Sequence, residues 1–208
     1  LIITALSLVL VWLVLYIAAE LGAFKKGDKL QGIRKELTAV ELTRLMGNGI
    51  NLGNTMEAYG HASLGTNAAV SSYETLWGQP VTTQEMITAM KKSGFDTIRI
   101  PVAWTNTMNF ESGDYTIRED WFARVEEIVG YAMNENMYVI VNDHWDGSWW
   151  GMFGSATAKT RQKAMDMYIS MWTQIAERFK NYSDYLIFES ANEELGDRLN
   201  DQDIAKDS

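Results

Sequence analysis

The sequence predicts an α/β fold, about the first four βα units of a (β/α)8 TIM barrel, preceded by an N-terminal hydrophobic helix. Predicted strands alternate with predicted helices, and this alternation implies parallel strand pairing with right-handed crossovers. Polar side chains also gather at the carboxyl end of each predicted strand, where such a barrel assembles its active site. The chain has 208 residues, fewer than eight units of this length require, so we expect only the N-terminal half of the barrel.

The chain divides into three predicted regions. Residues 1–22 contain an uncharged apolar stretch that nearly reaches the roughly 20 residues needed to cross a bilayer. We interpret this region as a membrane-spanning signal anchor or a signal peptide, with a buried core helix as a third interpretation. Residues 23–37 are predicted to be a linker, and residues 38–208 the partial barrel. Either leading interpretation makes the protein extracellular, or membrane-anchored and facing outside; an uncleaved segment would make the membrane a partner.

The first unit begins with a helix after Thr38, which forms a capping-box pair with Glu41. The short apolar segment 49–54 is predicted to be a strand that ends in amides. A long loop, 55–80, follows it. This loop carries four ring side chains, of which His61 is expected on the surface: Tyr59, His61, Tyr73 and Trp77.

Helices and strands alternate through the rest of the chain. Thr82 with Glu85 is predicted to cap a helix that ends near Lys92, and Thr116 with Glu119 to cap the next one. That next helix has an apolar face made of Phe122, Val125, Ile128, Val129 and Ala132. The last helix has an apolar stripe, expected in the core, made of Ala164, Met167, Tyr168, Met171, Trp172, Ile175 and Phe179. Further strands are predicted over residues 97–102, 138–144 and 185–193.

Polar residues occupy the carboxyl ends of the predicted strands: Asn51, Asn54, Arg99, Asn142, His144, Glu189, Asn192 and Glu193. Alternate residues of a strand share a face, so Glu189 and Glu193 are expected on the same side, with Glu189 deeper. Arg99 is expected to point inward and to require an anion, for which Glu189 is the structural partner. A carboxyl group near aromatic side chains can act as a general acid. Together these residues predict hydrolysis of a glycan by two carboxylates.

The composition argues against several other classes of function. The formal net charge is −9 and no basic run occurs, so nucleic acid is not an expected partner. The chain has no cysteine and two histidines, which argues against disulfides, thiolate chemistry and a multi-histidine metal site. No glycine-rich phosphate-binding turn follows a predicted strand. We therefore expect no cofactor and no metal, while the eight tryptophans offer faces suited to sugar rings.

Five segments resemble glycoside hydrolase family 5, the cellulase family, and they occur in the family's order: INLGNT (50–55), WGQPVTT (77–83), IRIPVAW (98–104), VNDHWDG (141–147) and LIFESANEE (186–194). The similarity is greatest to the broad endoglucanase subfamily that acts on β-1,4-glucans and xyloglucan. The resemblance implies a retaining, endo-acting glycosidase whose substrate is a β-glucan polysaccharide or oligosaccharide of the cellulose or xyloglucan type.

The resemblance also implies roles for individual residues. Glu193 takes the position of the acid/base, and Asn192 that of the asparagine that contacts the sugar 2-hydroxyl. Arg99 matches the arginine that orients the nucleophile, His144 the histidine that lines the −1 site, and Asn54 an amide near the bound sugar. The family's nucleophile is a glutamate after the seventh strand, beyond these residues. We therefore expect the 208 residues alone to be inactive.

The sequence departs from the family pattern at two positions. Glu194 stands where the family usually has proline, and Trp145 where relatives often have a second histidine. Three tryptophans are candidate substrate-binding platforms, with packing as the alternative: Trp145, Trp149 and Trp150. Two other functions stay open, a non-catalytic glycan-binding barrel and a metal-dependent barrel hydrolase. The latter would use Asp143, His144 and Asp146.

Overall fold

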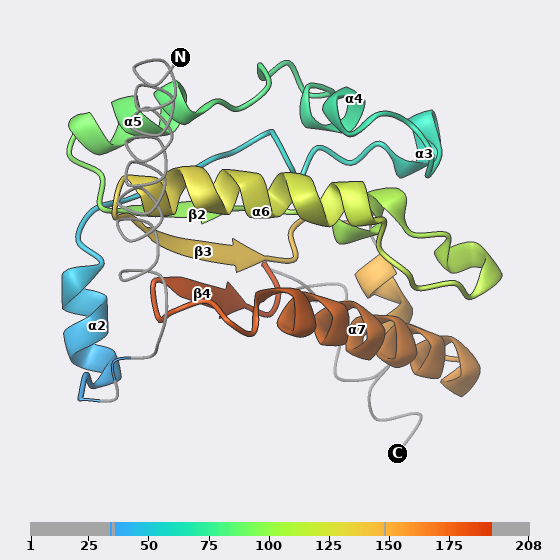
Figure 1. The fold of residues 1–208 in the computed structure, drawn as a ribbon. Coiled ribbons are helices and arrows are strands. Elements are labelled where there is room, and N and C mark those ends of the chain that lie inside the picture. Colours follow the sequence, from blue (N-terminus) through green and yellow to red (C-terminus); the bar gives the residue numbers. More distant parts are fainter. Residues whose placement is uncertain (1–33, 35, 148, 193–208) are drawn as a thin grey trace, which may run out of the picture.

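The computed structural model describes residues 34, 36–147 and 149–192, which form a four-stranded sheet with helices packed against it (Figure 1). The strands are β1 (Gly49–Asn51), β2 (Thr97–Ile100), β3 (Tyr138–Asn142) and β4 (Leu186–Glu189). They pair in chain order, and every pair is parallel. The predicted α/β fold with four parallel strands is therefore confirmed. The predicted membrane segment, 1–22, lies outside the described residues.

The register of the sheet brings the predicted polar residues to one edge. Arg99 of β2 lies opposite Asn51 of β1, and Asn142 of β3 lies opposite Glu189 of β4. Because parallel strands end at a common edge, the segments that follow them meet there. The strands are shorter than predicted; β2, for example, ends just before Pro101, which has no N–H to donate to a neighbouring strand.

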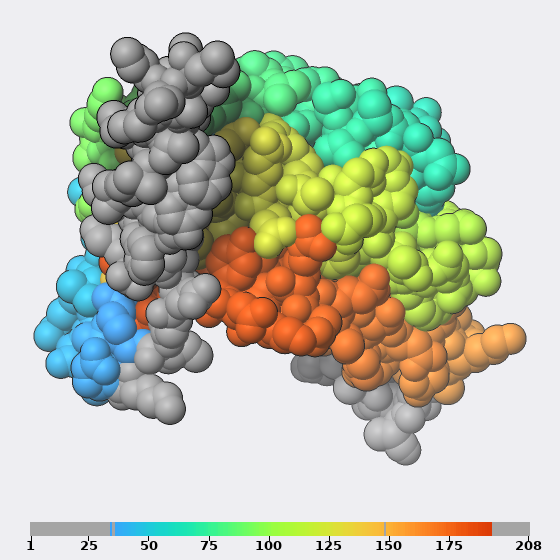
Figure 2. All heavy atoms as spheres, viewed as in Figure 1, coloured from blue at the N-terminus to red at the C-terminus, as the bar shows by residue number. Residues whose placement is uncertain are grey.

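The core lies between the sheet and the helices that connect its strands, which are α5 (Gln84–Lys92), α6 (Glu119–Asn134) and α7 (Ala158–Phe179). The predicted apolar face of α6 is buried throughout. The stripe of α7 is buried except for Tyr168 and Trp172, which are half-buried. Alternate residues of β2 and β3 complete the core and are fully buried: Ile98, Ile100, Val139 and Val141. Figure 2 shows α6, in yellow, above α7, in orange, on the face of the molecule that is turned to the viewer.

The helix starts agree only in part with the predicted caps. Helix α2 (Ala39–Leu45) begins with the expected capping box, since Thr38 and Glu41 each accept a backbone hydrogen bond from the other. The predicted cap of α5 is wrong by one residue, because Thr83 and not Thr82 accepts from the Met86 amide.

The predicted cap of α6 is also wrong. Arg118 occupies the N-cap position and makes no capping hydrogen bond through its side chain. Thr116 instead belongs to the preceding turn, where its amide donates to the Asp114 carboxylate at 3.0 Å. A threonine–x–x–glutamate spacing in a polar segment fits a turn as well as a helix start, which explains the error.

The connections after the strands contain short helices that the sequence did not predict. The segment predicted as a long loop, 55–80, includes α3 (His61–Leu64) and α4 (Val70–Glu74). Three 3-10 turns follow later strands: η1 (Trp104–Thr107), η2 (Phe110–Ser112) and η3 (Trp149–Gly154). Tyr73 of α4 is fully buried and packs edge-on against Trp121, with ring centroids 5.6 Å apart. The segment is therefore part of the packed structure.

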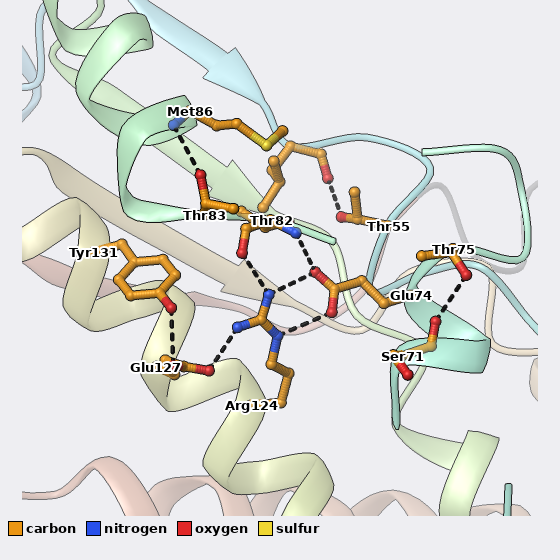
Figure 3. Close-up of polar contacts among 11 residues, drawn as sticks. Thr55, Ser71, Glu74, Thr75, Thr82, Thr83, Met86, Arg124, Glu127 and Tyr131 are labelled. Atoms are coloured by element: carbon orange, nitrogen blue, oxygen red, sulfur yellow. Dashed lines mark hydrogen bonds and ion pairs between the residues drawn. The ribbon is translucent and has the colours of Figure 1, made fainter. Parts of the chain in front are cut away.

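A buried ion pair connects α4 with α6 (Figure 3). Arg124 of α6 donates to both carboxylate oxygens of Glu74, at 2.9 Å from Nε and 2.8 Å from Nη2. The same guanidinium donates to the Thr82 carbonyl and to Glu127, while the Thr82 amide donates to Glu74. The side chain of Glu74 is 1% exposed. This network holds the segment between β1 and α5 against the next helix.

Candidate active site

The centre of the candidate site is an ion pair between β2 and β4. Arg99 donates from Nε to Glu189 Oε2 at 2.7 Å and from Nη2 to Glu189 Oε1 at 2.6 Å. Two parallel hydrogen bonds to one carboxylate hold the plane of the guanidinium group in a defined orientation. The hydrogen bonds from Arg99 lower the pKa of Glu189, so this carboxyl stays ionised and is unsuited to donate a proton. The predicted role of Glu189 as the partner of Arg99 is confirmed.

Asn192 joins this pair. Its side-chain carbonyl accepts from Arg99 Nη2 at 2.7 Å, and its backbone amide donates to the backbone carbonyl of Asp143 at 3.1 Å. The segment after β4 is thereby tied to both β2 and the loop after β3. Glu193, the predicted acid/base, follows directly in the sequence but lies outside the described residues, as does Glu194.

His144 lies beside the same ion pair and is oriented by Asn142. The Asn142 side-chain nitrogen is 3.2 Å from His144 Nδ1 and 3.4 Å from Glu189 Oε1. If Asn142 donates to Nδ1, the neutral imidazole carries its hydrogen on Nε2 and offers that nitrogen as a donor. The His144 amide donates to the Val102 carbonyl at 3.0 Å, which fixes the backbone after β3 to the segment after β2.

Asn54 is exposed, lies three residues after the end of β1, and has a backbone φ of 62°, in the left-handed region. The buried side chain of Glu57 holds this turn, because its carboxylate accepts from the amides of Asn54 at 2.5 Å and Thr55 at 2.9 Å. Burial raises the pKa of Glu57, while these hydrogen bonds and the charge of Arg99 oppose the rise. Glu57 is not among the residues predicted from the sequence, where its signal is a carboxylate three residues after Asn54 in the turn that follows β1.

The three candidate tryptophans separate into two groups. Trp145 is 47% exposed and has a φ of 37°, an uncommon conformation for a bulky residue. Trp149 and Trp150 are buried and stack on each other, with ring centroids 4.5 Å apart. Phe153 and Tyr168 complete this cluster. Trp149 and Trp150 therefore pack in the core, and their faces are not open to a sugar ring. For these two residues the prediction of a substrate platform is wrong, and the alternative of packing holds.

His61 is not a surface residue as predicted, because its side chain is only 10% exposed. Its ring stacks on Phe110 with centroids 4.6 Å apart, and its two nitrogens lie 3.0 Å from the Thr105 carbonyl and 2.9 Å from Glu111. These contacts join α3 to the connection after β2. His61 is thus engaged in packing.

Two buried aspartates flank His144 and Trp145. Asp146 accepts from the Thr105 amide, at 3.0 and 2.9 Å to its two oxygens, and from the Thr105 hydroxyl at 2.5 Å. Asp143 accepts from the Trp150 indole at 2.7 Å. Both carboxyls thus face the protein interior, which does not support the metal-binding alternative with His144. Among the residues that the structure describes, no group of three or more side chains could hold a metal ion.

A hollow of about 190 Å³ opens beside Arg99 on the inner side of the sheet. It is lined by Gly49, Ile50, Asn51, Thr97, Arg99 and Ile140. The site thus combines a fixed guanidinium, amides, an imidazole and an exposed indole at the carboxyl edge of a parallel sheet.

Comparison with known proteins assigns this arrangement to a family. The model of the cellulase family, glycosyl hydrolase family 5, matches residues 59–205. Endoglucanase B of Clostridium cellulovorans is 42% identical over 162 residues, which are 78% of this chain and 33% of that protein. The chain thus spans about a third of the length of this curated relative.

Solved structures of the family superpose on the described fold. A broad-specificity endoglucanase of Ruminococcus champanellensis with bound cellotriose gives a TM-score of 0.68 at 37% identity, covering 76% of this chain and 44% of that one. A family 5 glycoside hydrolase of Prevotella bryantii, in complex with a xyloglucan tetradecasaccharide, gives 0.65 at 38% identity, covering 78% and 46%. The sheet described above corresponds to part of their barrel.

Proposed function

Because the chain belongs to glycosyl hydrolase family 5, the cellulase family, we propose that the whole protein is a retaining endo-β-1,4-glucanase. The observation that carries the proposal is the fixed group of Arg99, Glu189 and Asn192 at the carboxyl edge of the sheet. Glu193, next in the sequence, is the proposed acid/base. The nucleophile is proposed to be a glutamate on a later strand of the barrel, about 5–5.5 Å from the Glu193 carboxyl.

Each fixed residue has a proposed task in the double displacement. Glu189 and Asn192 together engage Nε and Nη2 of Arg99, and Nη1 makes no hydrogen bond to a described residue. We assign the N–H groups of Nη1 to the nucleophile carboxylate, which they would orient and keep ionised. Asn192 is assigned to the sugar 2-hydroxyl, where hydrogen bonds strengthen in the transition state.

The proposed substrate is a β-1,4-glucan of the cellulose or xyloglucan type. Two of the family structures contain cellotriose and a xyloglucan oligosaccharide, which supports this class. Within this chain, Trp145 offers an exposed ring, and His144 and Asn54 offer hydrogen-bonding groups at the same edge. We assign these three residues to contacts with the sugar.

We also propose that the protein acts outside the cell, either secreted or anchored to the membrane by residues 1–22. The proposal is supported by the apolar sequence of that segment and by a polymeric substrate too large to enter a cell. Within the described part of the chain, none of the helices is long and apolar enough to span a bilayer.

The complete enzyme with Glu193→Gln tests the proposed chemistry. Loss of the transferable proton is expected to reduce turnover of unactivated glucan by about 10²–10⁴-fold. Aryl glycosides with activated leaving groups should keep a fast first step, because they do not need protonation. The matched control is Glu194→Gln, which should cost far less. Hydrolysis of glucan by Glu193→Gln at the normal rate would refute the assignment.

The stereochemistry of the reaction gives a second, independent test. Proton NMR of the first product from a cello-oligosaccharide should show the β-anomer before mutarotation, as retention requires. An initial α-anomer would exclude the double displacement. Binding of the oligosaccharide without any hydrolysis by the complete protein would instead favour a glycan-binding barrel.

A further inference from the structure

Glu57 is a buried carboxylate that the proposed chemistry does not use. It follows β1 in the same turn as Asn54, and it is 4% exposed. Asn54 itself is exposed and belongs to the proposed site. A buried carboxylate is costly unless hydrogen bonds or opposite charges compensate it, so the place of Glu57 beside an exposed site residue needs a physical explanation.

Backbone amides of the turn compensate the carboxylate of Glu57. Its Oε1 accepts from the Asn54 amide at 2.5 Å, and its Oε2 accepts from the Thr55 amide at 2.9 Å. A Cβ added to Gly53 would lie 3.7 Å from the same Oε1, so the carboxylate also packs against the backbone before Asn54. Hydrogen bonds from amides to a carboxylate favour its ionised form and are about twice as strong as those between neutral groups.

Both ends of the turn are fixed to β2 and to the segment that follows it. The Leu52 amide donates to the Arg99 carbonyl at 2.8 Å, and the Met56 carbonyl accepts from the Ala103 amide at 3.0 Å. Between these two anchors, the side chain of Glu57 holds two consecutive amides of the turn. The turn is therefore fixed relative to Arg99, at the centre of the candidate site.

The backbone of Asn54 depends on such contacts. Its φ of 62° lies in the left-handed region, which asparagine enters more readily than most residues but still seldom. A residue in that region persists only where the surrounding structure imposes it. A fixed backbone also fixes the direction in which the side chain leaves it. The exposed amide group of Asn54 offers both hydrogen-bond donors and an acceptor, which suits sugar hydroxyls.

We propose that Glu57 is a positioning residue that holds Asn54 in the orientation in which it contacts the sugar. This role rests on the proposed function, which assigns Asn54 to the substrate. Glu57 does not itself touch the sugar, since it is buried and both of its oxygens are engaged by amides of the turn. The turn is ordered when the protein folds, so substrate binding does not have to supply the free energy of ordering it.

Three substitutions in the complete protein separate this role from a general effect on folding. Glu57→Gln keeps the length of the side chain but replaces one acceptor oxygen by an NH₂ group, which cannot accept from an amide. Glu57→Asp keeps the charge on a shorter side chain and serves if Glu57→Gln does not fold. Asn54→Gly removes the side chain alone, because glycine adopts a φ of 62° without strain.

The matched control is Asp114→Asn. Asp114 is an exposed carboxylate that accepts from a backbone amide of a different turn, that of Thr116, at 3.0 Å. The control therefore changes the same kind of hydrogen bond outside the turn of Asn54. We expect it to alter neither sugar binding nor the exchange of amides near Asn54.

Amide hydrogen exchange measures whether Glu57 holds the turn. Exchange at the amides of Asn54 and Thr55 should be about tenfold faster, or more, in Glu57→Gln, as expected when a hydrogen bond to a charged group is lost. Asn54→Gly should leave exchange at the Thr55 amide within about threefold, because the turn is kept. Unchanged exchange in both Glu57→Gln and Glu57→Asp would refute the proposal. This measurement needs neither sugar nor turnover.

Binding of cellotetraose measures whether Glu57 acts through Asn54. Isothermal titration is carried out in a Glu193→Gln background, which keeps the sugar intact. Glu57→Gln and Asn54→Gly should each raise the dissociation constant by about fivefold, as for one lost hydrogen bond. The double variant should raise it no further than the larger single effect, since both changes remove one contact. Multiplied effects, about 25-fold, would show that the two residues act independently and would overturn the proposal.

Steady-state kinetics complete the test and separate it from that of the proposed function. For glucan hydrolysis, Glu57→Gln should raise KM about fivefold and leave kcat within about threefold, because a contact made equally in the ground and transition states is weakened. A lower kcat with unchanged KM would overturn the proposal. If the protein binds cellotetraose without hydrolysing glucan, the proposed function fails, while exchange and binding still decide the role of Glu57. Absence of cellotetraose binding would refute both.

Discussion

Arg124→Met tests whether the buried ion pair with Glu74 holds the segment after β1 on α6. The guanidinium donates two hydrogen bonds to Glu74, at 2.8 and 2.9 Å, and a third to the Thr82 carbonyl at 2.7 Å. Methionine keeps much of the apolar stem but leaves the Glu74 carboxylate, 1% exposed, with the Thr82 amide as its donor. Removing one partner of a buried pair costs about 3–5 kcal/mol, and we expect a loss in that range.

Two further variants identify the cause of the loss. Arg178→Met removes two ion pairs between α7 and α6, to Glu119 and Glu126, whose side chains are 75% and 32% exposed. It should cost less than about 2 kcal/mol, because an exposed pair contributes at most about 1 kcal/mol. Arg124→Met combined with Glu74→Met replaces the buried pair by apolar side chains. This double variant should recover most of the stability, because no uncompensated charge is left.

The free energy of unfolding is obtained from urea denaturation of each variant, followed by circular dichroism. The midpoint concentration should fall for Arg124→Met while the slope of the transition stays constant. A loss for Arg124→Met no larger than that for Arg178→Met would refute the reasoning. A double variant as unstable as the single one would show that the loss is caused by missing packing and not by the unpaired carboxylate.

Three other predictions follow from the same structure. Arg99→Lys cannot engage Glu189 through two parallel hydrogen bonds, so kcat of the complete enzyme should fall by about 10²-fold with KM little changed; a fall of less than threefold in steady-state assays would contradict this. Gly147→Ala should lower the melting temperature, because φ is 71° and a Cβ would lie 2.0 Å from the Tyr59 ring, whereas Gly151→Ala has open space and serves as the control. Asp146 has a folded-state pKa of about 6, above the usual value of about 3.9 for aspartate, so its contribution to stability is fully present below pH 4 and is lost as the pH rises to 6. Asp146→Asn should remove that decline. If the melting temperature falls by the same amount between pH 4 and 7 in the variant and in the unmodified protein, the prediction is contradicted.

The strand order and the central ion pair could be predicted from the sequence because simple periodicities encode them. Arg99 and Glu189 lie on inward-facing positions of short strands, and an inward arginine requires a carboxylate. Their pairing at 2.6 and 2.7 Å confirms that reasoning. The apolar face of α6 followed in the same way from a spacing of three and four residues.

Contacts between distant segments could not be predicted in this way. Trp145, Trp149 and Trp150 lie in one short segment, and no periodic pattern there separates a buried position from an exposed one. Trp149 and Trp150 are buried because η3 packs on α7. Glu57 gave no periodic signal because it lies in an irregular turn. Thr82 lies one residue before the N-cap of α5, and its amide donates to Glu74, eight residues earlier in the chain.

The pairing of each strand with the next one in the chain has a consequence for biosynthesis. Every strand pair of the described sheet joins consecutive units, so no strand has to wait for a distant segment before it can pair. Chains emerge from the ribosome with the N-terminus first, and early units can therefore begin to fold while later ones are still being made. Arg99 can meet Glu189 and Asn192 once the fourth strand has emerged. The scaffold of the proposed catalytic centre can thus assemble during translation.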